Sequence, residues 1–172
     1  MLESSTMKNG NALQPDSDFP SLEDFDPDFN APRADAKAIE EVLPHRGHMR
    51  QLDSVVWWSD DFVTSVGTRH LKDDEFWIPG HIPGRPLFPG VLMIETAAQL
   101  CSFTQMLSRE DIPFLGFTRC EDCAFRGSMV PGDEMTLIAK LLSSNRRRFI
   151  SRVHGYCNNK RILEVTITGM VL

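Results

Sequence analysis

The sequence predicts an α+β domain in which one antiparallel β-sheet wraps a single long α-helix. The C-terminal third is rich in β-forming residues, and its last segment alternates two sets of side chains with period two, as strands do. One earlier segment, Gly90 to Leu107, is apolar all round a helical turn, so no side of it suits water. Wrapping the sheet around this helix buries both apolar surfaces.

The individual elements follow in chain order. Residues 37–43 have the pattern of a short helix that ends before Pro44. Pro89 and Gly90 stand where the long helix should start. The predicted strands are residues 54–58, 62–70, 114–125, 135–142, 148–157 and 161–171. The predicted turns at 59–61, 143–145 and 158–159 make antiparallel hairpins.

Composition limits the function classes. The 172 residues amount to about one domain, with 41% hydrophobic and 24% charged residues. The net charge of -6 gives no general basic field, so we expect no nucleic-acid partner. The start lacks a signal-peptide pattern, and no charge-free apolar run approaches the ~20 residues that a bilayer requires. We therefore expect a cytoplasmic protein with no membrane insertion.

Two regions divide the chain by charge. Residues 1–36 contain eight acidic and two basic residues, whereas residues 37–172 balance to zero. We interpret residues 1–36 as an acidic arm, extended or disordered, because few aliphatic side chains could offset its ordering entropy. Its apolar exceptions are Phe19, Leu22, Phe25 and Phe29. They could form one stripe against a partner or against the domain formed by residues 37–172.

The four cysteines are too few for a disulfide scaffold. Cys120 and Cys123 form the one close pair, and no second Cys-x-x-Cys pair completes a zinc site. In an extended chain, side chains three residues apart also point to opposite faces, which separates the two sulfurs. We expect no metal.

Three residues around the helix start carry chemical interest. Glu95 lies in the apolar helix, where an ionised and unpaired carboxylate would be costly, and Gln99 shares its face four residues later. His81 lies just upstream, in a loop stiffened by glycine and proline. From the residues alone, a solvent-seeking Glu and a merely hydrogen-bonded His both remain open.

These residues belong to a longer motif, Gly80-His81-x-Pro83-Gly84-Arg85-Pro86-x-x-Pro89-Gly90-Val91-Leu92-x-x-Glu95-x-x-Ala98-Gln99. It closely resembles the signature of the 3-hydroxyacyl-[acyl-carrier-protein] dehydratases of fatty acid synthesis, FabZ type. The blocks Leu43-Pro44-His45-Arg46, with Asp53 beyond it, and Phe125-Arg126, with Val130-Pro131-Gly132-Asp133, resemble flanking parts of these enzymes. The resemblance covers about residues 38–172.

The resemblance implies a hot-dog fold and a lyase that converts (3R)-3-hydroxyacyl-[acyl-carrier-protein] into trans-2-enoyl-[acyl-carrier-protein]. It also implies a homodimer, which could assemble into a trimer of dimers, with His81 of one subunit facing Glu95 of the other. The sister enzymes that also isomerise the double bond carry Asp at the carboxylate position, so Glu95 favours the plain dehydratase. Two alternatives stay open: a 3-hydroxyacyl thioester dehydratase or hydratase of a specialised pathway, and a non-catalytic acyl-binding or scaffold protein.

The implied chemistry assigns a role to each residue. His81 is the base for the C2 hydrogen, and Glu95 gives a proton to the departing hydroxyl. The Gly90 N–H polarises the thioester carbonyl, and Gln99 orients Glu95 or a water. No cofactor is required. The substrate is bound to the phosphopantetheine of acyl carrier protein. Candidate carrier contacts are Arg126, Arg146, Arg147, Arg148 and Arg152.

Two stretches depart from the family pattern. Gly47-His48-Met49-Arg50-Gln51 is unusually polar where the family has aromatic and aliphatic residues, and Trp77-Ile78-Pro79 replaces two aromatics and a polar residue. We expect both to affect the acyl tunnel or a partner surface, and so the substrate rather than the reaction.

Overall fold

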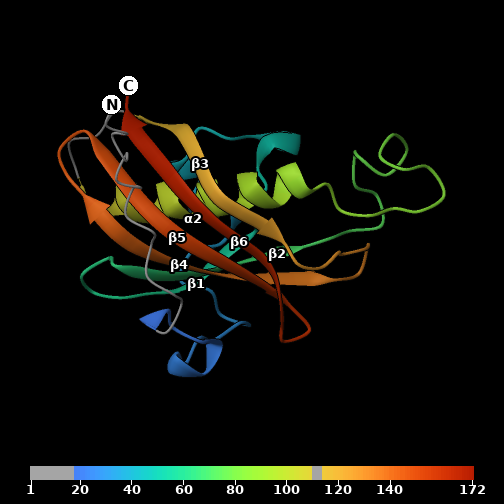
Figure 1. The fold of residues 1–172 in the computed structure, drawn as a ribbon, viewed down its shortest axis with the longest axis horizontal. Helices are drawn as coiled ribbons and strands as arrows, with labels where there is room; N and C mark the ends of the chain where they lie inside the picture. The colour runs from blue at the N-terminus through green and yellow to red at the C-terminus, as the bar shows by residue number, and fades with distance from the viewer. Residues whose placement is uncertain (1–17, 110–113) are drawn as a thin grey trace, which may run out of the picture.

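The computed structural model describes residues 18–109 and 114–172. These residues form one sheet of six antiparallel strands in the order β1-β2-β4-β5-β6-β3. The strands are β1 (Ser54–Trp58), β2 (Thr64–His70), β3 (Leu115–Phe125), β4 (Glu134–Ser144), β5 (Arg148–Cys157) and β6 (Lys160–Val171). Figure 1 shows this sheet curving around the long helix α2 (Gly90–Leu107). The predicted α+β class and the predicted helix are confirmed.

The core lies between α2 and the inner face of the sheet. Leu100 and Phe103 of α2 join one buried cluster with Leu137, Val153 and Val165, from three neighbouring strands. Alternate residues of a strand face the same side, which is why a single layer of strands supplies so much apolar surface to one helix. No helix among the described residues has both the length and the apolar composition needed to cross a membrane.

The first turn of α2 departs from the predicted burial. The buried residues of α2 are Met93 and all positions from Thr96 to Gln105, whereas Val91 in the first turn is 70% exposed. The end of the helix that carries Gly90 and Glu95 is therefore the part that the sheet of this chain encloses least.

Turn chemistry explains where the strand bounds differ from prediction. Phe62 has φ +57°, a left-handed conformation that belongs to a turn, so β2 begins at Thr64 rather than at residue 62. The side chain of Asn145 accepts the N–H groups of Arg147 and Arg148, which places that turn after Ser144. Asn158 and Asn159 both have positive φ, as a tight two-residue hairpin requires.

Residues 18–35 form what we call the N-terminal strap. The predicted extended or disordered arm spans residues 1–36; residues 1–17 lie outside the described residues, whereas the strap runs along the outer face of the sheet. Phe19, Leu22 and Phe25 pack there against a cluster made by Val56, Val66 and Ile138. Ala34 exchanges backbone hydrogen bonds with Val55 of β1, at 3.0 and 2.9 Å. Three of the four residues of the apolar stripe therefore lie on the domain itself, whereas Phe29 is 48% exposed.

Two small elements prepare the site. Helix α1 (Ala36–Val42) begins at Asp35, whose side chain accepts the Ala38 N–H, and a 3-10 turn follows at Gly47–Met49. Another 3-10 turn, Leu22–Asp24, lies in the strap. Between β2 and α2, residues 71–89 form a long connection that extends past the end of the sheet in Figure 1.

Candidate active site

His81 lies in the connection 71–89 and is placed by local turns. The N–H groups of Gly80 and His81 both donate to the Trp77 carbonyl, at 3.1 and 2.7 Å. The Trp77 ring is buried and meets the His81 ring edge-on, with centroids 6.5 Å apart. Gly84 then turns the chain back at φ +81°, a conformation that glycine adopts without strain. The stretch Trp77-Ile78-Pro79, which departs from the family pattern, thus places an indole next to the histidine ring.

One hydrogen bond defines the state of the His81 ring. Its Nδ1 lies 2.8 Å from the carbonyl oxygen of Leu87. Because a carbonyl oxygen accepts and cannot donate, Nδ1 carries the proton in this contact. In the neutral imidazole, Nε2 then has a free lone pair that can accept a proton. The predicted role of His81 as the base stays a prediction.

Glu95 lies on the second turn of α2 with 22% of its side chain exposed. The Gln99 side-chain amide donates to Glu95 Oε1 at 2.8 Å, so the predicted contact across one helical turn is present. His45 brings Nε2 to 3.3 Å from the same oxygen. One carboxylate oxygen is therefore contacted by two side chains from different parts of the sequence.

Gln99 is itself fixed by backbone. Its Oε1 accepts the N–H groups of Gln51 and Leu52, at 2.9 and 3.1 Å, and its Nε2 also donates to the Met49 carbonyl at 2.6 Å. The side chain is buried. The unusually polar segment 47–51 thus fixes Gln99 through its main chain, and Gln99 in turn contacts Glu95.

Gly90 is the first residue of α2, and the helix has no side-chain cap. The Phe125 side chain of β3 packs against the helix start, where a Cβ at position 90 would lie 2.8 Å from the end of its ring and would make the ring shift. Helix starts present N–H groups and a partial positive charge to a ligand. The predicted role of the Gly90 N–H stays a prediction.

Arg126 follows Phe125 and pairs with a buried carboxylate. Its Nε and Nη2 donate to Glu164 at 2.6 and 3.1 Å. Arg152 and Arg161 reach the same carboxylate at 3.6 and 2.8 Å. The Arg126 hydrogen bond is the largest reason why the pKa of Glu164 lies below its ordinary value, outweighing the opposing effect of burial.

The predicted carrier contacts are thus divided in space. Arg126 and Arg152 converge on Glu164 together with Arg161, which the sequence did not single out. Arg146 and Arg147 lie in the turn that joins β4 to β5, at the opposite end of β5 from Cys157.

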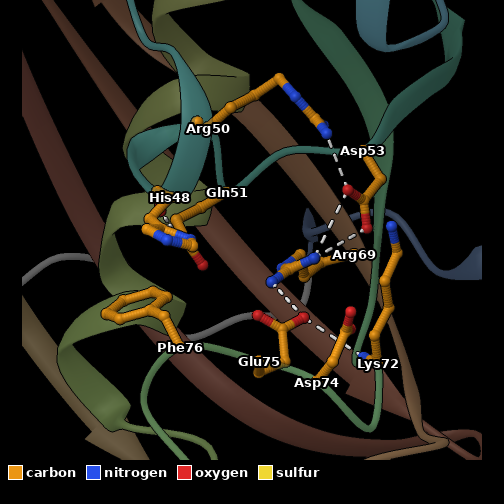
Figure 2. A pocket seen from close by; sticks show the side chains of 10 residues that line it. His48, Arg50, Gln51, Asp53, Arg69, Lys72, Asp74, Glu75 and Phe76 are labelled. Atoms are coloured by element: carbon orange, nitrogen blue, oxygen red, sulfur yellow. Dashed lines mark hydrogen bonds and ion pairs between the residues drawn. The ribbon is translucent and has the colours of Figure 1, made fainter.

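A polar pocket of about 200 Å³ lies beside this site. Figure 2 shows Arg69 between Asp53 and Glu75, which accept from its guanidinium at 3.1 and 2.7 Å. Asp53 also accepts the His70 N–H at 2.8 Å, so the network ties the end of β2 to the start of the connection that carries His81. The lining of the pocket includes Gly47, His48, Arg50 and Gln51, which belong to the polar stretch that departs from the family pattern.

Cys120 and Cys123 lie closer together than the sequence predicts, because β3 is not a regular strand here. Register shifts in β3 between Glu121 and Ala124, with Asp122 at φ +47°, make a bulge. Cys120 and Cys123 therefore do not point apart as in a regular strand, and contact between their thiols contributes, after burial, to raising the pKa of Cys123 to about 11. Among residues 18–109 and 114–172, no three His, Cys, Asp or Glu side chains gather as metal ligands would.

The structure brings together some of the predicted residues and keeps others apart. Glu95 and Gln99 touch, and Gly90 begins the same helix. No hydrogen bond or ion pair joins His81 to Glu95 within the described chain. The sequence reasoning missed His45 as a contact of Glu95, although the block Pro44-His45-Arg46 was noted as a motif.

The sheet that wraps around one long helix defines a hot-dog fold. Residues 43–166 match the FabA-like domain family. The chain is similar to the 3-hydroxyacyl-[acyl-carrier-protein] dehydratase FabZ of Neisseria meningitidis, with 32% identity over 115 residues that cover 65% of this chain and 76% of the relative. The chain therefore belongs to the FabA-like family, as a hot-dog dehydratase of the FabZ type.

Solved structures agree on the fold. The dehydratase heterocomplex ApeI:P of Xenorhabdus doucetiae aligns with a TM-score of 0.67 and 16% identity, over 78% of this chain and 90% of that one. A mutant of the thioesterase PA1618 of Pseudomonas aeruginosa aligns with a TM-score of 0.62 and 12% identity, over 81% and 95%. At these identities the likeness concerns the fold alone.

Proposed function

We propose that this chain is a lyase that removes water from (3R)-3-hydroxyacyl-[acyl-carrier-protein] to give the trans-2-enoyl product in fatty acid synthesis. Residues 37–172 are its catalytic domain. One observation carries the proposal: this chain, which is similar to FabZ, contains two groups of opposite function. They are the His81 imidazole, whose Nε2 can accept a proton, and the Glu95 carboxyl group, which Gln99 and His45 hold.

The reaction uses these groups in turn. His81 Nε2 takes the proton from C2 of the substrate, and negative charge develops on the thioester oxygen, where the Gly90 N–H stabilises it. The electron pair then forms the C2–C3 double bond while the C3–O bond breaks. Glu95 gives its proton to the leaving hydroxyl, which departs as water. Return of the His81 proton to Glu95, through solvent or directly, completes the cycle with no cofactor.

The reaction requires two copies of the chain. We propose that His81 of one subunit works with Glu95 of the other, because no contact joins them within one chain. The exposure of Val91 in the first turn of α2, and of Phe117 and Phe125 along the edge strand β3, supports a subunit contact along this strand.

The carrier contact is proposed at the arginine cluster on Glu164. Three guanidinium groups, those of Arg126, Arg152 and Arg161, form a patch around Glu164 next to Phe125 and the start of α2. Acyl carrier proteins are acidic, so such a patch would attract them.

The four free cysteines also suit the reducing cytoplasm in which we place the protein.

Turnover of the full chain tests the function. The purified protein is mixed with 3-hydroxyacyl-[acyl-carrier-protein] of several chain lengths, and loss of water is followed by mass spectrometry of the acyl group. We expect sustained formation of the enoyl product. Folded protein that binds the acyl group without turning it over would reject the lyase and favour the scaffold alternative.

A charge variant tests the carrier contact. Arg126→Ala should lower kcat/KM by about 5- to 10-fold for the carrier-bound substrate, because rim charges act on encounter. It should not change kcat/KM for an N-acetylcysteamine thioester, which lacks the acidic carrier. The matched control is Arg147→Ala, on the β4–β5 turn. An equal loss with both variants, or with both substrates, would reject this docking site.

A further inference from the structure

The histidine of the block Pro44-His45-Arg46 contacts the proposed acid, Glu95. His45 Nε2 lies 3.3 Å from Glu95 Oε1, and Gln99 Nε2 donates to that same oxygen at 2.8 Å. In the described chain, Oε2 of Glu95 takes part in no hydrogen bond or ion pair. The two oxygens of the carboxyl group are therefore unequal.

The backbone of His45 is fixed from behind by its neighbours. Pro44 follows the end of α1, and Arg46 folds back so that its guanidinium donates to the carbonyls of Glu40, Leu43 and His45, at 2.6, 2.6 and 2.8 Å. Carbonyls at a helix end lack intrahelical partners, and a guanidinium satisfies several of them at once. The motif thus holds the imidazole at a set place beside α2.

The His45 ring has no competing task among the described residues. Its Nδ1 is buried and has no hydrogen-bond partner there, so Glu95 is the polar contact toward which the ring is directed. Glu95 Oε1 accepts a hydrogen bond from Gln99 and also acts as the acceptor toward His45. The proton of the His45 ring therefore lies on Nε2.

We infer that His45 is a positioning residue for the catalytic carboxyl group, an inference that rests on the proposed dehydratase function. With Gln99 it supplies two donors to Oε1, so the acidic proton resides on Oε2, the oxygen left for the substrate hydroxyl. Proton transfer depends steeply on placement, and a shift of about 1 Å can cost 100-fold in rate. His45 therefore acts on kcat through Glu95, without touching substrate.

Two amide substitutions separate this role from a structural one. Glutamine can place its amide nitrogen near the position of imidazole Nε2, whereas asparagine reaches only as far as Nδ1. We expect His45→Asn to lower kcat about 10- to 100-fold with KM within about 2-fold, and His45→Gln to restore most of kcat. Equal kcat for the two variants and the wild type would overturn the inference, and so would equal losses without rescue.

A double-mutant cycle adds a readout that folding does not affect. In a Glu95→Gln background, His45→Asn should cause no further loss of kcat, because the group that it positions is already gone. Independent, multiplying losses would contradict the inference. His70→Asn is the matched control: its side chain is exposed at the end of β2, and the variant should keep wild-type kcat. Absence of turnover in the wild type would instead reject the dehydratase function itself.

Discussion

The two halves of the proposed acid–base pair are held in opposite ways. His81 lies on a connection that extends past the sheet, and short-range contacts to Trp77 and Leu87 set its place. Glu95 lies on the core helix and is held by buried Gln99, which distant backbone groups fix one helical turn away, and by His45, fifty positions away. The base is thus positioned by local turn chemistry and the acid by the tertiary fold.

This difference teaches which perturbations should reach which group. Strain within the connection should change the placement of His81 and leave global stability nearly intact. Loss of buried contacts near Glu95 should change stability and chemistry together, because the same bonds serve both.

The largest effect should come from removing either group. His81→Ala and Glu95→Gln should each lower kcat by about 100- to 10,000-fold, the range of general acid–base catalysis. Refolding the two variants together should restore about a quarter of the wild-type activity, since half of random dimers have one intact site in two-fold symmetry. Steady-state kinetics before and after refolding measures this. A mixture as inactive as its parents, with dimers shown by size, would break the shared-site arrangement.

The acid side is sharpened by Gln99→Leu. The N–H groups of Gln51 and Leu52 would lose their acceptor, and a buried donor left unsatisfied costs about 1–3 kcal/mol. We expect the free energy of unfolding to fall by about 3 kcal/mol and kcat to fall as well. Urea unfolding and kinetics are measured on the same preparations. Gln105→Leu, at another buried glutamine of α2, should reduce stability but not kcat; losing activity to the same degree would refute the distinction.

The base side is sharpened by Gly84→Ala. At φ +81° an L side chain costs about 1–2 kcal/mol, and the space around Gly84 is open, so the strain acts on the turn rather than through a clash. We expect kcat to fall about 10-fold while the melting temperature changes little. Gly132→Ala, also at positive φ in open space, is the control and should keep kcat. A large change in melting temperature with unchanged kcat would contradict local control of His81.

The smallest effect should come from Glu164→Gln, outside both regions. Arg126 lowers the folded-state pKa of Glu164, so its ionised form stabilises the fold at neutral pH, and this stabilisation is lost as pH falls through that lowered pKa. The variant should be less stable by about 1–2 kcal/mol at pH 7, and the difference should shrink on acidification. Thermal unfolding across this pH range measures it. A gap that widens in acid would show the opposite sign of linkage.

Local patterns carried much of the fold. Pro89 and Gly90 mark the start of α2, and the apolar residues that follow predict its length and the burial of residues 96–105. Asn158 and Asn159 predict a tight hairpin because they tolerate positive φ. Such features depend on neighbours in sequence, which is why sequence alone reveals them.

Features that depend on distant contacts were not predictable in the same way. The bulge at Asp122 reverses the expected separation of Cys120 and Cys123, and no local residue type requires it. The contact of His45 with Glu95 joins residues fifty positions apart. The glycine–proline motif indicated His81 and Glu95, but it could not show that one carboxyl oxygen is occupied and the other available.

The hydrogen bonds between Ala34 and Val55 bear on how the sheet ends. β1 is one border of the sheet order, and the chain's own strap occupies part of that border, whereas β3 at the other border is paired on one side within the described chain. Unpaired strand borders invite further chains to add on. A sheet blocked at one border and open at the other can join one copy and then stop, which favours a closed pair of subunits over an open-ended fibre.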